Sequence, residues 1–296
     1  MTQNNHEQAP FHETDPTKLI PFNSFDINRH RIEQIAGIDG PIVDELAKVF
    51  GVEKPENGWD VASLGELISI VGPAKTLQDN IPAMEGILPG VDGKRFAIEW
   101  VKQSGLLEPA FRNYENPDRL VPHLFETAVI TGGVSNWMMR RAEVLIETLQ
   151  NGTEILEVNL VAGMREMRTA EGSDVLEGDT EASYMERVIK PLIESSTNVT
   201  VDLSTPETTS GNEISAEVAK ITKGAESVLV ACNAGNWIQN AGQIRRAMDE
   251  DKNKVFVVSD TFPVAENDEP PAEAQNPLTA VGIIGRNLQE LKRQTQ

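Results

Sequence analysis

Between Thr127 and Val258 the chain alternates short apolar runs with longer amphipathic segments, and this alternation constrains the fold more than any other feature. The apolar runs are rich in valine, isoleucine and leucine: Thr127–Ile130, Glu157–Val161, Val199–Leu203, Val228–Ala231 and Val255–Val258. The other segments have apolar residues at helical spacing: Trp137–Gln150, Glu181–Glu194, Gly211–Thr222, Ile238–Asp249 and Leu278–Lys292. Strands that alternate with helices form a mainly parallel sheet, so we expect an α/β domain of about five strands over residues 125–296.

The sequence ahead of this domain has a different pattern. Residues 1–27 are polar with scattered prolines, which predicts a flexible or extended arm. Residues 28–124 contain segments with apolar residues at three- and four-residue spacing, interrupted by glycine and proline, which predicts a small helical subdomain. Its last stretch, Gly105–His123, contains three prolines and is expected to be the connection to the sheet.

The chain of 296 residues is acidic, with a formal net charge of −20. A surface of this charge repels phosphate backbones and anionic lipids, so we expect neither nucleic acid nor membrane as a partner, but a small molecule. The N-terminal residues are polar and acidic, and the single cysteine, Cys232, excludes an intramolecular disulfide. These features predict a cytoplasmic protein.

Histidine is absent from the predicted sheet domain, because the four histidines, His6, His12, His30 and His123, all precede it. A Ser-His-Asp hydrolase and a histidine-rich metal site are therefore disfavoured, and we predict no metal. Cys232 follows a predicted strand without an obvious basic partner, so we expect a small buried side chain rather than a nucleophile.

The loops that follow the predicted strands are the place to look for a ligand site. Right-handed crossovers put all of them at one edge of a parallel sheet, the carboxyl edge, where ligands of such folds bind. In the first loop Gly132 and Gly133 allow a tight turn and close backbone approach, and Asn136 begins a helix that contains Arg141. The alternative is a structural turn, with Ser135 or Asn136 as the helix cap.

The second loop contains Gly163 and Arg165, and Arg165 is a candidate clamp for an anionic ligand. The alternative is an ion pair between Arg165 and the nearby Glu166 or Glu171. The acidic residues 169–180 that follow are expected to be a solvated linker, or else a lid.

The remaining loops offer small polar side chains. Thr209 and Asn212 lie beside a predicted helix start, which suits phosphate or ribose, although Ser210-x-x-Glu213 also fits a capping box. The fourth loop contributes two amides and the fifth an aspartate that binds a ribose hydroxyl, polarises water or caps the turn: Asn233, Asn236 and Asp260.

In their order along the chain these loops resemble the SanA/YdcF-like family over roughly residues 126–260. The resemblance rests on Thr131-Gly132-Gly133, Arg141, Gly163 with Arg165, Thr180-Glu181-Ala182, Thr209–Asn212 after Asp202, and Arg246-Ala247. The chain departs from the family in the fourth loop, where members often have a histidine and an arginine but this sequence has Asn233, Gly235, Asn236 and Trp237.

The resemblance implies a Rossmann-like three-layer domain that binds a nucleotide-like or phosphorylated small molecule, with S-adenosylmethionine as one candidate. It also gives weight to Glu181, which is otherwise only an acid in the first turn of a helix. Two alternatives stay open at this point. One is a hydrolase or transferase that acts on a phosphate or glycosyl bond through Glu181 and Asp260, and the other is a noncatalytic interaction protein.

Overall fold

A computed structural model describes residues 53–56, 58, 110–114, 119–233, 237–248, 254–260 and 290. Within these residues the elements follow one another as β1 (Ala110–Asn113), β2 (Leu124–Thr131), α7 (Ser135–Gln150), β3 (Glu154–Val161), η2 (Thr169–Glu171), α8 (Glu181–Tyr184), η3 (Met185–Ile189), α9 (Lys190–Ser196), β4 (Thr200–Ser204), α10 (Gly211–Ile221), β5 (Val228–Cys232), α11 (Trp237–Ala247) and β6 (Val255–Ser259). The predicted arm, the predicted helices before Gly105, and Leu278–Lys292 apart from Glu290 lie outside these ranges.

The strands form one sheet of six strands in the order β1-β6-β5-β2-β3-β4. Strands β2 to β6 pair in parallel, and β1 pairs antiparallel with β6 at one edge. From β2 the chain moves outward through β3 to β4, and then crosses to β5 and β6 on the other side of β2. The order of the strands therefore reverses between the neighbours β2 and β5.

The five parallel strands and the helices between them confirm the predicted α/β fold. Each predicted strand is present, and β2 and β3 begin three residues earlier than the apolar runs indicated. Their added residues alternate between exposed and buried positions, with Phe125 and Ile155 buried, and so differ from the continuous apolar runs by which the strands were predicted. Pairing with the neighbouring strand extends them.

The expectation for Gly105–His123 was wrong in one respect, because this stretch contains β1 and is not only a connection. The strand has four residues and pairs with β6 in a register that places Ala110 opposite Ser259. The amide of Ala110 donates to the Ser259 hydroxyl at 3.1 Å. The sheet thus includes residues from ahead of the predicted boundary at residue 125.

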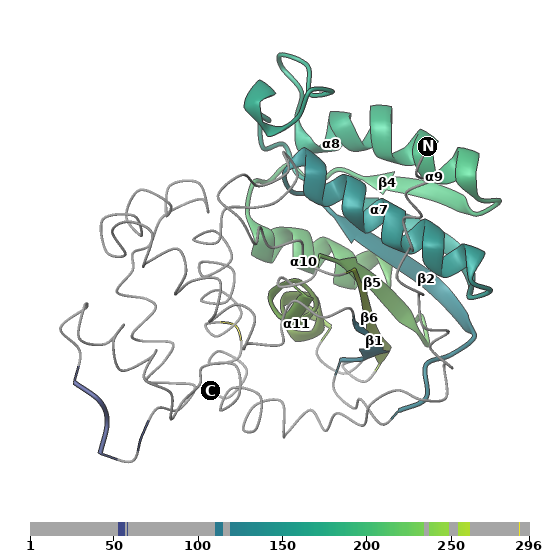
Figure 1. Cartoon of the computed structure of the whole chain (residues 1–296), viewed down its shortest axis with the longest axis vertical. Coiled ribbons are helices and arrows are strands. Elements are labelled where there is room, and N and C mark those ends of the chain that lie inside the picture. The colour runs from purple at the N-terminus through teal and green to yellow at the C-terminus, as the bar shows by residue number, and fades with distance from the viewer. Residues whose placement is uncertain are drawn as a thin grey trace, which may run out of the picture.

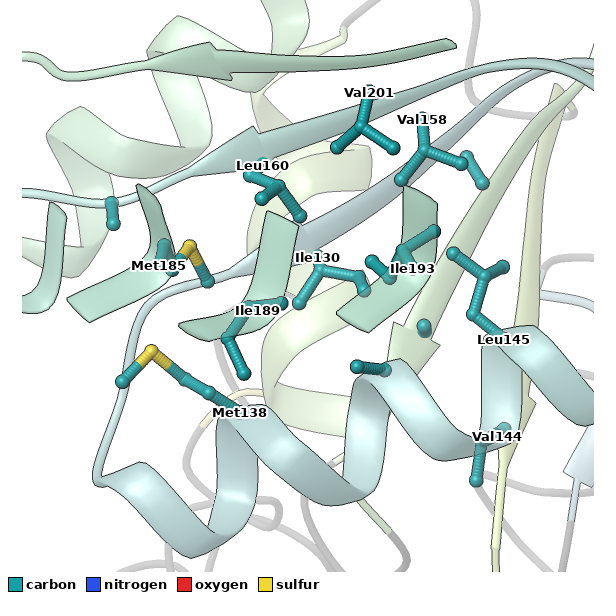
Figure 2. Packing of buried hydrophobic residues seen from close by; sticks show 14 of the residues in the cluster. Ile130, Met138, Val144, Leu145, Val158, Leu160, Met185, Ile189, Ile193 and Val201 are labelled. Atoms are coloured by element: carbon teal, nitrogen blue, oxygen red, sulfur yellow. The ribbon is translucent and has the colours of Figure 1, made fainter. Parts of the chain in front are cut away.

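The helices α7, α8 and α9 lie together along the sheet, whereas α10 and α11 pack against each other and contact β3, β5 and β6 (Figure 1). Figure 2 shows how apolar side chains of α7, η3 and α9 meet those of β2, β3 and β4. Ile130, Leu145 and Ile193 are fully buried in this cluster. Burying such a side chain stabilises the fold by about 1.5–3 kcal/mol.

The helix predicted over Glu181–Glu194 is present as a continuous run of α8, η3 and α9, with a π-helical turn at Met185–Ile189. Pro191 explains the widened turn. Proline has no amide hydrogen, and its ring would collide with the carbonyl group four residues earlier in a regular α-helix. The π turn ends at Ile189, two residues before Pro191, and the helix continues past the proline.

Candidate functional site

The predicted site residues that the structure brings together lie at the carboxyl edge of the sheet, where the strand order reverses. In open α/β sheets this is the usual position of a ligand. Hydrogen bonds or close contacts link six of these residues into one network: Gly132, Gly133, Arg141, Arg165, Glu181 and Asn233.

Arg141 joins the ends of β2 and β5 from the second turn of α7. It is 2% exposed, although arginine is rarely buried. Its Nε donates to Oδ1 of Asn233 at 2.7 Å, and its Nη1 donates to the carbonyl oxygens of Thr131 at 2.6 Å and Gly132 at 3.0 Å. Asn233 in turn donates to the carbonyl oxygen of Trp137. Arg141 and Asn233 therefore hold the first and fourth loops together.

The guanidinium of Arg141 makes these bonds to neutral acceptors. Burial lowers its pKa, and the nearby acidic groups of Cys232, Glu181 and Asp260 oppose that shift. Of the residues that the structure describes, none accepts a hydrogen bond from Nη2. A methyl group on Gly133 would lie 3.8 Å from this atom. The turn formed by Gly132 and Gly133, called the glycine turn below, therefore passes close to Nη2.

Glu181 is the first residue of α8, and a capping box fixes this position. Thr180 accepts from the amide of Ser183, and the Ser183 hydroxyl accepts from the amide of Thr180. The Glu181 side chain is 12% exposed, and its Oε1 accepts from Nε of Arg165 at 2.6 Å. Burial raises the pKa of Glu181 despite the opposing charge of Arg165.

The second oxygen of the Glu181 carboxylate lies against the backbone of Gly132. A Cβ atom at residue 132 would be 2.3 Å from Oε2, which no side chain could tolerate without moving the carboxylate. Glycine at this position is therefore needed for the close approach. The atom that Gly132 admits in this structure belongs to Glu181, and its contact with a ligand stays a prediction.

Arg165 forms the ion pair that the sequence offered as an alternative to a ligand clamp. Its Nη1 and Nη2 donate to the two carboxylate oxygens of Glu171 at 2.8 and 3.0 Å, and Nη2 also donates to the carbonyl of Gly133 at 3.2 Å. The hydrogen bond to Glu171 raises the pKa of Arg165 further above its usual range. Burial acts to raise the pKa of Glu171, but its contacts with Arg165 outweigh burial and lower it.

The acidic segment 169–180 is not a solvated linker, because three of its acids bind other parts of the domain. Glu171 pairs with Arg165, Asp174 accepts from the hydroxyl of Tyr184 at 2.5 Å, and Asp179 pairs with Arg187. The hydroxyl of Ser135 donates to the backbone carbonyl of Glu171 at 2.5 Å. The segment is thus attached to the start of α7 and to η3.

Gly163 contacts the third loop rather than an open space. A Cβ atom there would lie 2.0 Å from the carbonyl oxygen of Thr208, which accepts from the amide of Met164 at 2.8 Å. The loops after β3 and β4 therefore meet backbone to backbone at this glycine.

The predicted capping box at Ser210 and Glu213 is wrong. The Ser210 side chain makes no capping hydrogen bond, and Glu213 accepts from the hydroxyl of Thr208. The amide of Ser210 also donates to this hydroxyl, at 2.9 Å, so Thr208 organises the loop. Thr209 and Asn212 are exposed, and they are not bonded to the network around Arg141 and Glu181.

The other predicted residues are placed as follows. Asn136 is exposed in the first turn of α7, and neither Asn136 nor Ser135 caps this helix, since the N-cap is Val134. Asp260 is half-buried just beyond β6, and its negative charge acts to raise the pKa of Arg141. Asn236 lies outside the described residues.

Cys232 is completely buried, as the sequence predicted, and burial raises its pKa to about 12. We expect the native protein not to react with Ellman's reagent at neutral pH, because the thiolate is the reactive form. Full reaction is expected in denaturant. The absorbance of the released thiolate measures both, and rapid labelling of the folded protein would contradict the prediction.

No protein-family model, curated protein or solved structure matches this chain. In the ranges described above, no helix combines the length and the apolar character that crossing a membrane would require. The same ranges contain no group of three or more His, Cys, Asp or Glu residues arranged to hold a metal ion.

Proposed function

We propose that this chain contains a Rossmann-like three-layer domain of the SanA/YdcF-like type, which binds a nucleotide-like or phosphorylated small molecule at its carboxyl edge. The strand order supports this proposal, because it is the order of doubly wound nucleotide-binding folds on either side of the reversal. S-adenosylmethionine is one candidate ligand.

The observation that carries the proposal is the buried guanidinium of Arg141 beneath the glycine turn. Its Nη2 is the donor atom that the described residues leave unused. An anionic group above Gly133 would supply the missing acceptor and offset the cost of a buried positive charge. The first amides of α7 have no acceptors within the helix, and they favour a negative charge at the same end.

Replacing Gly133 by alanine tests this position. The new methyl group would lie 3.7 and 3.8 Å from Nη1 and Nη2 of Arg141, which is ordinary contact, so the fold should tolerate it. It would occupy the space that a ligand needs to reach Nη2. We expect isothermal titration calorimetry with adenosine monophosphate, S-adenosylmethionine and inorganic phosphate to show at least about tenfold weaker binding, or about 1.4 kcal/mol.

Gly211→Ala is the matched comparison at the start of α10, directly after the third loop, where the methyl group would also make only ordinary contact, at 3.5 Å from Oε1 of Gln243. Weaker binding by Gly211→Ala alone would move the ligand to the exposed Thr209 and Asn212. Absence of binding to all three probes at millimolar concentration would contradict the proposed function.

The environment of Glu181 supports a second candidate, a hydrolase or transferase acting on a phosphate or glycosyl bond. Burial raises the pKa of this carboxyl group, as it does in general acids. Asp260 would be its partner in this mechanism. The test is turnover of phosphate ester or glycoside substrates. Loss of turnover in Glu181→Gln, with turnover kept in Glu166→Gln, which changes an exposed glutamate, would favour this candidate.

A further inference from the structure

Arg165 divides its donors unequally between two carboxylates. Both Nη atoms bind Glu171, at 2.8 and 3.0 Å, and only Nε binds Glu181, at 2.6 Å. The side chain of Glu171 is 2% exposed, compared with 31% for that of Arg165, so this pairing is the more enclosed of the two. The planar guanidinium can form its two-pronged contact with one carboxylate at a time along the Nη edge.

The backbone around Glu171 holds its carboxylate in position. Its carbonyl oxygen accepts from the hydroxyl of Ser135, and its Oε1 also accepts from the amide of Arg168 at 3.2 Å. The next residue, Gly172, packs so closely on Ser135 that a Cβ atom would lie 2.3 Å from the Ser135 hydroxyl oxygen. These contacts fix the turn at η2 to the start of α7.

We propose that Glu171 is a positioning residue: by occupying both Nη atoms of Arg165, it makes Arg165 hold Glu181 through one oxygen and leaves Oε2 presented beside Gly132. The inference rests on the proposed ligand site and specifies its chemistry. Because the Arg165 donors are already used, the group that meets Oε2 has to be a hydrogen-bond donor, such as a ligand hydroxyl or amino group, and not a phosphate.

The pKa of Glu181 depends on how Arg165 contacts its carboxylate, so the titration of Glu181 tests this pairing without any ligand. The charged groups that act on Glu181 are Arg165 from the loop after β3, Arg141 from α7 and Glu171 from η2. If Glu171 no longer reached both Nη atoms, Arg165 could turn its two-pronged edge towards Glu181. A second charge-assisted hydrogen bond to the carboxylate would lower its pKa.

The decisive variant is Glu171→Asp, which keeps the negative charge but shortens the side chain. We expect the pKa of Glu181, followed by carbon-13 NMR of the glutamate carboxyl groups and assigned with Glu181→Gln, to fall by about one pH unit. Glu171→Gln should lower it at least as much, because it also removes a negative charge. The control is Glu166→Gln, which neutralises an exposed acid beside Arg165 and should leave the Glu181 titration unchanged.

An unchanged Glu181 titration in Glu171→Asp would overturn the inference, even if Glu171→Gln shifted it, because the effect would then be one of charge alone. The wild-type protein provides a second measurement, independent of whether the variants fold. Nitrogen-15 NMR should resolve separate, slowly exchanging Nη signals for Arg165, and one averaged signal would equally overturn the inference. Neither result depends on a ligand, so failure here is distinct from failure of the proposed function.

Discussion

Replacing Gly163 by alanine is expected to lower the free energy of unfolding by about 3 kcal/mol. The new Cβ atom would be 2.0 Å from the carbonyl oxygen of Thr208 and 3.1 Å from its carbonyl carbon. Both are backbone atoms, so no side-chain rotation relieves the overlap. The loops after β3 and β4 would have to separate, which would also strain the hydrogen bond between Met164 and Thr208.

Urea denaturation followed by circular dichroism measures this effect, and Gly133→Ala is its matched control. Both variants add one methyl group to a glycine in a loop at the carboxyl edge, but the methyl group at residue 133 has no atom closer than 3.7 Å among the described residues. We expect Gly133→Ala to change the stability by less than about 0.5 kcal/mol. Similar stabilities for the two variants would show that the contact at Gly163 relaxes easily.

Replacing Arg141 by methionine is the second large change, and we expect it to cost about 3 kcal/mol. Methionine fills much of the same space but donates no hydrogen bonds. The side chain of Asn233 would lose a donor in a buried environment, and the carbonyl oxygens of Thr131 and Gly132 would each lose one in a partly buried environment. The ends of β2 and β5 would then no longer be joined through this side chain.

The neighbouring Arg140 provides the comparison for this prediction. Its side chain is 46% exposed and pairs with Glu143 at 3.4 Å, an i,i+3 contact of a kind that contributes little. Arg140→Met should therefore change the unfolding free energy by less than about 0.5 kcal/mol. If Arg141→Met proved as stable as the wild type, the cost of burying the guanidinium would have to equal what its hydrogen bonds contribute.

Much of the fold could be predicted from the sequence because its signals are local. Runs such as Val228–Cys232 and Val255–Ser259 are almost entirely apolar and rich in valine, as is typical of strands buried on both faces. The strand β1 gives no such signal. It has four residues, and its partner β6 lies far along the chain, with Ala110 and Ser259 separated by 149 positions.

The sequence predicts which residues form the candidate site better than it predicts which of them pair with one another. Gly132, Arg141, Arg165 and Glu181 lie together at the predicted edge, since strand ends and loop order determine that much. Which acid pairs with which arginine depends on tertiary contacts, and sequence reasoning missed the role of Glu171 because it treated Glu171 as a surface partner. The capping box at Ser210 failed for a similar reason, since the hydroxyl of Thr208 competes for Glu213.

The pairing of β1 with β6 has a consequence for where the domain can be cut. A shortened protein that began at Leu124, as the change in sequence pattern suggests, would contain every parallel strand but leave the outer side of β6 uncovered. The unpaired main-chain groups of an apolar strand such as Val255–Ser259 are a template for self-association. A soluble fragment should therefore start ahead of Ala110, and a fragment that lacks β1 should aggregate during expression.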